Sequence, residues 1–94
     1  MARYHLEVPH TPEECVADLD SILGYSREMF NRFDWGCKGG EHVGWATVEA
    51  QDPATARMLL PMVVRGKARV VSVNKFTADE VKAFHEEMAP RQGT

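Results

Sequence analysis

Residues 4–8, Tyr-His-Leu-Glu-Val, alternate between apolar and polar side chains, and this period of two predicts a first strand with its apolar side chains on one face. The pattern then changes to helical spacing. Thr11 and Glu14 have the spacing of a capping box, with a proline at the first helical position between them. We expect this helix to run to about Leu23, with Gly24 as its left-handed stop.

Strands and short helices are predicted to alternate through the rest of the chain. Two apolar runs are joined by Gly39-Gly40, which is typical of a β-hairpin. An Asp-Pro pair at 52–53 and a Thr-x-x-Glu capping box at 77–80 predict two more helices. The expected elements are a strand from Met29 to Cys37, a strand from His42 to Ala50, a helix from Asp52 to Pro61, a strand from Ala68 to Phe76 and a helix from Thr77 to about Met88. Residues 90–94 are expected to be frayed.

The order of these elements is strand, helix, strand, strand, helix, strand, helix. It predicts an α+β fold, a ferredoxin-like βαββαβ antiparallel sheet with one added C-terminal helix. Right-handed crossovers place the first strand between the third and the fourth, with the second strand outside the third. The end of strand one, the end of strand two, the start of strand three and the N-terminus of the first helix are then expected at one edge of the domain.

Composition narrows the classes of function. The chain is long enough for a single domain, residues 1–94, with a thin core. Its 44% hydrophobic and 27% charged residues are ordinary for a folded soluble protein, so disorder is not expected. No apolar run reaches the ~18 residues of a membrane span, and the N-terminus has no signal-peptide pattern, so we expect a cytoplasmic protein without a membrane partner. A net charge of −3 without a Lys/Arg cluster argues against a nucleic-acid partner.

A cysteine and a histidine lie on either side of the predicted hairpin turn. With the turn centred on Gly39-Gly40, Cys37 and His42 are expected to form a cross-strand pair on the helix-covered face. His10 continues the apolar parity of the first strand, and Cys15 lies on the inner side of the opening turn of the first helix. These two His/Cys pairs, distant in sequence, are therefore expected to converge at one edge of the sheet.

Two thiolates and two imidazoles suit a transition metal, with zinc as the first choice and copper or nickel as alternatives. The helix N-terminus would stabilise the Cys15 thiolate. Four ligands would make a closed site with a structural, carrier or sensing role, whereas a site without Cys15 would leave a coordination position open for catalysis. The alternative interpretation is that both cysteines are small buried hydrophobes and both histidines are hydrogen-bonded rim residues.

The other face of the predicted sheet is polar, except for Trp45 and Val43, and no helix is expected to cover it. A second copy of the sheet is the natural cover, which predicts a homodimeric α+β barrel with a cavity between the sheets. His5, beside Glu7 or Asp34, could then act as a general base on a small-molecule ligand, and Arg32 could hold an anion. The alternative interpretation is a solvated polar face with one exposed tryptophan.

The segments YHLEVPHTPEEC, WGCKGGEHVGW and VVSVNKF, together with the order of elements, resemble the dimeric α+β-barrel superfamily of ferredoxin-like proteins. Within it, the likeness is to small bacterial members whose function is not assigned, and it covers about residues 3–86. The resemblance implies a fold and a homodimer. It implies no single activity, because the superfamily includes small-molecule monooxygenases, lactone isomerases and haem enzymes.

Two hypotheses about function follow from these patterns. The first is a small metal-binding protein with a site at His10, Cys15, Cys37 and His42. The second is a cofactor-independent dimeric barrel enzyme, isomerase-like or monooxygenase-like, that acts on a small organic molecule between the protomers. Elemental analysis of the purified protein distinguishes them.

Overall fold

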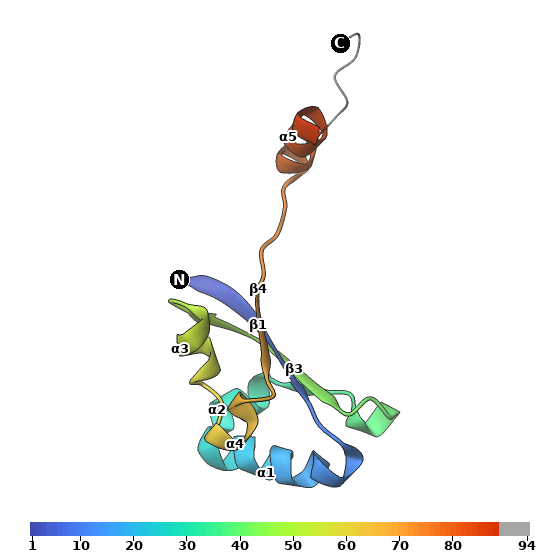
Figure 1. Ribbon diagram of the computed structural model, residues 1–94, viewed down its shortest axis with the longest axis vertical. Coiled ribbons are helices and arrows are strands. Elements are labelled where there is room, and N and C mark those ends of the chain that lie inside the picture. The colour runs from blue at the N-terminus through green and yellow to red at the C-terminus, as the bar shows by residue number, and fades with distance from the viewer. Residues whose placement is uncertain (89–94) are drawn as a thin grey trace.

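A four-stranded antiparallel sheet forms the centre of the computed structural model, which describes residues 1–88 (Figure 1). The strands are β1 (Ala2–Pro9), β2 (Asp34–Trp35), β3 (Val43–Ala50) and β4 (Arg69–Ser72). Their order is β2-β3-β1-β4, so β1 lies between β3 and β4, and β2 lies outside β3, as the crossovers predicted. The α+β class with an antiparallel sheet is confirmed. The expectation for residues 90–94 lies outside the described part of the chain.

Helices α1 to α4 lie on one side of the sheet (Figure 1). Both predicted capping boxes form, each by two reciprocal hydrogen bonds between a threonine and the glutamate three residues later. The helical elements are the 3-10 turns η1 (Pro12–Glu14) and η2 (Cys37–Gly39) and the α-helices α1 (Cys15–Tyr25), α2 (Arg27–Arg32), α3 (Pro53–Arg57), α4 (Met62–Arg65) and α5 (Ala78–Met88). Within residues 1–88 no helix has the length and the apolar character that crossing a bilayer requires.

The predicted strand from Met29 to Cys37 is wrong over most of its length. Residues 27–32 form α2, and only Asp34–Trp35 is strand. The Ser26 side chain accepts a hydrogen bond from the Met29 backbone N–H at 3.1 Å and so caps α2. Gly24 is not the stop of α1, because the helix continues to Tyr25 and ends where Ser26 becomes extended.

The segment between β2 and β3 is not the two-residue hairpin that Gly39-Gly40 suggested. It contains η2, and Gly40 follows in the left-handed region with φ 95°. Trp35 pairs with Gly44 as predicted, but Cys37 and His42 are not a ladder pair. Two other elements are shorter than expected: the helix predicted from Asp52 to Pro61 is divided into α3 and a separate α4 that begins after Pro61, and β4 ends at Ser72.

The core lies between the sheet and helices α1 to α4. The apolar side chains of β1 point into it, which confirms the predicted parity, and Ala46 and Val48 of β3 share that face. The fully buried side chains of greatest volume are Leu6, Ile22, Leu60, Val8 and Val64. Beyond β4 the chain leads away from this core, and α5 stands apart from it (Figure 1).

Candidate metal centre

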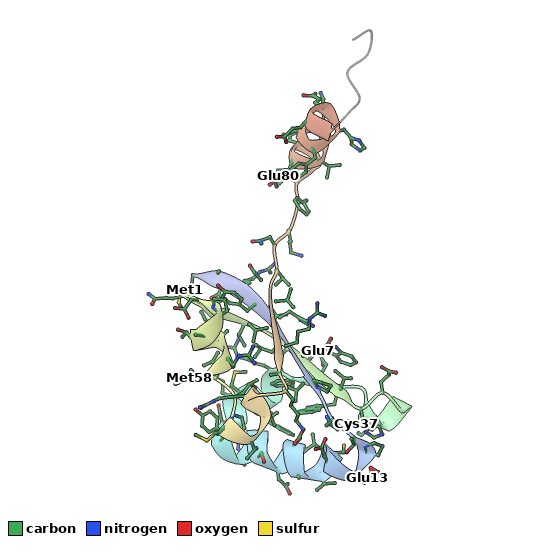
Figure 2. The ribbon with its side chains drawn as sticks, in the orientation of Figure 1. Met1, Glu7, Glu13, Cys37, Met58 and Glu80 are labelled. Atoms are coloured by element: carbon green, nitrogen blue, oxygen red, sulfur yellow. The ribbon has the colours of Figure 1, made fainter. Side chains whose placement is uncertain are left out.

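The four predicted ligands, His10, Cys15, Cys37 and His42, lie together in the folded chain. Each offers one ligand atom, and these atoms all lie within 4.8 Å of one another. Figure 2 shows Cys37 near Glu13, at the end of the molecule where η1 leads into α1. Segments separated by more than twenty residues therefore meet at the sheet edge that the topology predicted.

The two histidines are brought together by an extension of the β1–β3 ladder. The last ladder pair is Pro9 with Val43, and one step further the His10 N–H donates to the His42 carbonyl oxygen at 3.0 Å. Their ring centroids are 5.6 Å apart, in an edge-to-face arrangement. The backbone hydrogen bond thus fixes both rings at the same edge.

The two cysteines come from the starts of two helical turns. Cys15 is the first residue of α1, directly after the capping box of Thr11 and Glu14, and Cys37 is the first residue of η2. Gly36 holds η2 in place, because its N–H donates to the Val43 carbonyl oxygen at 3.0 Å. Cys37 therefore reaches the centre from a short turn and not from a strand, contrary to the expected cross-strand pair.

Both thiols are free and half-buried. Burial raises the pKa of the Cys37 thiol above its ordinary value, and the neighbouring Cys15 thiol raises it further through a hydrogen bond and through charge. The metal-free protein therefore keeps a proton on Cys37 that a metal ion would have to displace.

The side chain of His10 is fully enclosed, at 0% exposure. Its Nε2 lies 3.2 Å from Cys37 Sγ, so this nitrogen faces the other ligands. Its Nδ1 is buried without a hydrogen-bond partner among the described residues, as is Nδ1 of His42. Buried polar atoms without partners are rare. An ion bound at the centre of the cluster would supply the missing partner for a ring nitrogen that faces this centre.

Aromatic residues border the centre on the side of Cys37. Trp35 stacks on Phe33 with ring centroids 5.1 Å apart and lies 6.0 Å from the His10 ring. Gly44 permits this arrangement, because a Cβ atom there would lie 2.6 Å from the Trp35 ring. A mainly apolar pocket of about 410 Å³ adjoins Cys37; it is lined by Leu19, Phe30, Phe33, Asp34, Trp35, Cys37 and Lys38.

The residues proposed for the alternative, enzymatic site are only partly brought together. Glu7 and Asp34 both pair with Trp45, whose Nε1–H donates to Glu7 Oε1 at 3.3 Å. His5 is two residues before Glu7 on the same face, with Nδ1 3.4 Å from the Thr47 hydroxyl. Arg32 does not project from this sheet face as predicted. It ends α2 and pairs with Glu28 at 3.4 Å.

Two residues beside the centre were missed by the sequence interpretation. Asp18 is 6% exposed, and Lys67 Nζ lies 2.6 Å from its Oδ2. A signal for Asp18 was present, because it is three residues after Cys15, on the helix face that also buries Ile22. No local pattern indicates that Lys67, from the segment between α4 and β4, would reach it.

Comparisons with known proteins give no family for the chain: no family model, no curated protein and no solved structure matches it. The resemblance to the dimeric barrel superfamily stays a prediction. The positions and contacts of His10, Cys15, Cys37 and His42 are therefore the basis for a functional proposal.

Proposed function

We propose that this chain is a small metal-binding protein that holds one divalent transition-metal ion, zinc first, through His10, Cys15, Cys37 and His42. The observation that supports the proposal is the mutual approach of the four ligand atoms to within 4.8 Å. Two thiolates and two imidazoles are a common ligand set for structural zinc, and nickel or copper are the alternative ions.

The spacing fits a tetrahedral ion after a small contraction. With Zn–S about 2.3 Å and Zn–N about 2.0–2.1 Å, the ligand atoms of a tetrahedral site are about 3.3–3.8 Å apart. His10 Nε2 and Cys37 Sγ, 3.2 Å apart, are already slightly closer than this range. The widest separation in the cluster, within 4.8 Å, is about 1 Å longer, which side-chain rotations can remove.

Charge balance favours a divalent ion over a monovalent one. Two thiolates neutralise a divalent cation, and the histidines bind as neutral imidazoles. The nearby Asp18 carboxylate is already compensated by Lys67 at 2.6 Å. A monovalent ion would leave one uncompensated negative charge in a half-buried site, which is unfavourable.

Four protein ligands would leave no open position for a substrate, so the proposed role is structural or carrier. The ion would tie the end of β1, the start of α1 and η2 together, and its binding free energy would add to the stability of the fold. Two free thiols fit a reducing compartment, so we propose a cytoplasmic location.

Metal content of the purified protein tests the proposal. We expect one zinc per chain, which is lost in Cys37→Ser and in His42→Ala. The matched control is His85→Ala, since His85 is an exposed histidine of α5, outside the cluster. A Cys37→Ser protein with full zinc content would contradict the proposal.

Cys15→Ser then separates the closed site from an open one. In the closed site this change removes a ligand and most of the affinity, whereas in a three-ligand site it changes affinity little. A three-ligand result would exclude the structural role and favour a catalytic centre with an open position.

We further propose a homodimer of ferredoxin-like units, paired through the sheet face opposite α1 to α4. In its support, that face contains the half-buried Trp45 beside Glu7, and the strand order is compatible with this fold. The cavity of such a dimer would be the place for the second candidate function, a cofactor-independent isomerase-like or monooxygenase-like enzyme using His5, Glu7 and Asp34. A folded monomer at micromolar concentration in a sedimentation experiment would contradict the homodimer and, with it, the enzyme cavity between the protomers.

A further inference from the structure

Asp18 is a buried charge that the four-ligand site does not use. At 6% exposure it is the one buried polar or charged residue within residues 1–88. Burying a carboxylate is unfavourable unless other groups compensate it. Its partner Lys67 reaches it at 2.6 Å, with the Lys67 side chain itself 28% exposed.

The Asp18 carboxylate also faces the metal cluster. Its Oδ2 lies 3.9 Å from His10 Nδ1, which is buried and has no hydrogen-bond partner among the described residues. The other nitrogen of the same ring, Nε2, points to Cys37 Sγ. The His10 ring therefore lies between Cys37, on the side of its Nε2, and Asp18, on the side of its Nδ1.

We infer that Asp18 is the positioning residue of the metal centre, accepting a hydrogen bond from the Nδ1–H of His10 while Nε2 binds the ion. This inference depends on the proposed metal site and adds to it the means by which one ligand is oriented. The separation of 3.9 Å is too long for a hydrogen bond, and a ring shift of about 1 Å on metal binding closes it.

The carboxylate fixes the tautomer of the ligand. An imidazole that donates through Nδ1 has its lone pair on Nε2, where the ion binds, and a carboxylate acceptor makes that nitrogen a stronger base. Lys67 compensates the charge of the carboxylate through the same oxygen, Oδ2, that faces His10 Nδ1, and a carboxylate oxygen can accept from both groups. Metal-ligating histidines commonly have such a partner.

Zinc affinity, measured by competition with a chromophoric chelator, tests the inference in the full chain. We expect Asp18→Asn to bind one zinc with about 10- to 100-fold lower affinity than the unmodified protein. The matched control is Asp20→Asn, which makes the same chemical change at an exposed position of the same helix and is expected to leave the affinity within about twofold.

A long-range ¹H–¹⁵N spectrum of the zinc-bound, unmodified protein supplies a readout that a merely structural role of Asp18 would not give. Metal on Nε2 of His10 with a proton on Nδ1 supports the inference, and metal on Nδ1 overturns it. This measurement also decides the matter if Asp18→Asn is too unstable to purify.

The remaining outcomes separate this inference from the metal site itself. If the unmodified protein binds no zinc, both are overturned. If it binds zinc in a manner that depends on Cys37, but Asp18→Asn matches Asp20→Asn in affinity, the metal site stands and the positioning role is overturned.

Discussion

Helices α1 and α5 begin with the same local signal but lie in different surroundings. Each is 11 residues long and has a Thr-x-x-Glu capping box at its N-terminal end. In α1 one face packs on the sheet, and Ile22 is 0% exposed. In α5 the apolar residues Val81 and Phe84 are 44% and 46% exposed, and the helix stands away from the core (Figure 1).

The difference shows that a cap starts a helix but does not place it. The position of α1 is fixed by its buried face, and Cys15, in its first turn, belongs to the candidate metal cluster. The apolar contacts of α5 are local, such as the edge-to-face pair of Phe76 and Phe84 with centroids 5.5 Å apart. The two helices should therefore respond differently to metal removal, core truncation and loss of the cap.

Metal removal should have the largest effect and should act on α1. At free zinc about 1,000-fold above Kd, binding stabilises the fold by about 4 kcal/mol. A chelator should therefore lower Tm by roughly 15–30 °C, because about 1 kcal/mol corresponds to about 4–8 °C in a domain of this size. Hydrogen exchange should show faster exchange of the α1 amides and unchanged exchange in α5. Equal changes in both helices would contradict the account.

Truncation of the buried face of α1 should rank second. Ile22→Ala leaves a cavity in the core and should lower the free energy of unfolding by about 3 kcal/mol. Val81→Ala truncates a side chain of similar size on the exposed face of α5. This substitution should change the free energy of unfolding by less than about 0.5 kcal/mol. Denaturant unfolding of both variants checks the difference. A large effect of Val81→Ala would show that α5 is packed on another chain.

Loss of the threonine cap should have a smaller effect. Thr11→Ala should lower the free energy of unfolding by about 1 kcal/mol and weaken zinc binding, because the box precedes Cys15 directly. Thr77→Ala should reduce helical circular dichroism but leave the unfolding midpoint of the core unchanged. Identical effects of the two substitutions on the midpoint would contradict the distinction between the helices.

The pH dependence of the first cap should be the smallest effect. The hydrogen bond from the Thr11 backbone, followed by the charge of Lys67, lowers the pKa of Glu14 below its ordinary value. Ionised Glu14 therefore stabilises the fold at pH values above its ordinary pKa. This stabilisation is lost as the pH falls through the lower pKa of the folded state. Glu14→Gln should reduce the acid loss of Tm over that range. An unchanged dependence of Tm on pH would show that the charge of Glu14 does not stabilise the fold.

The sequence was a good guide where the signal is local. Alternation in residues 4–8 gave the buried face of β1, and the Thr-x-x-Glu spacing gave both caps. Met29 and Phe30 were misassigned to a strand because a short apolar run fits a helix equally well, and the Ser26 cap decided in favour of the helix.

The candidate site could be anticipated from topology but not in its detail. The edge where His10, Cys15, Cys37 and His42 meet follows from the crossovers, although Cys37 arrives from η2 and not from a strand. The approach of Lys67 to Asp18 depends on how the segment after α4 packs, which no periodicity of the chain records.

X-ray absorption at the zinc edge of the purified protein reports the ligands of the proposed four-ligand site. We expect one zinc per chain with two sulfur ligands at about 2.3 Å and two nitrogen ligands at about 2.0–2.1 Å. Any zinc that the Cys15→Ser protein still binds should have one sulfur ligand instead of two. A zinc shell of nitrogen and oxygen atoms only, or a spectrum unchanged in Cys37→Ser, would contradict the four-ligand site.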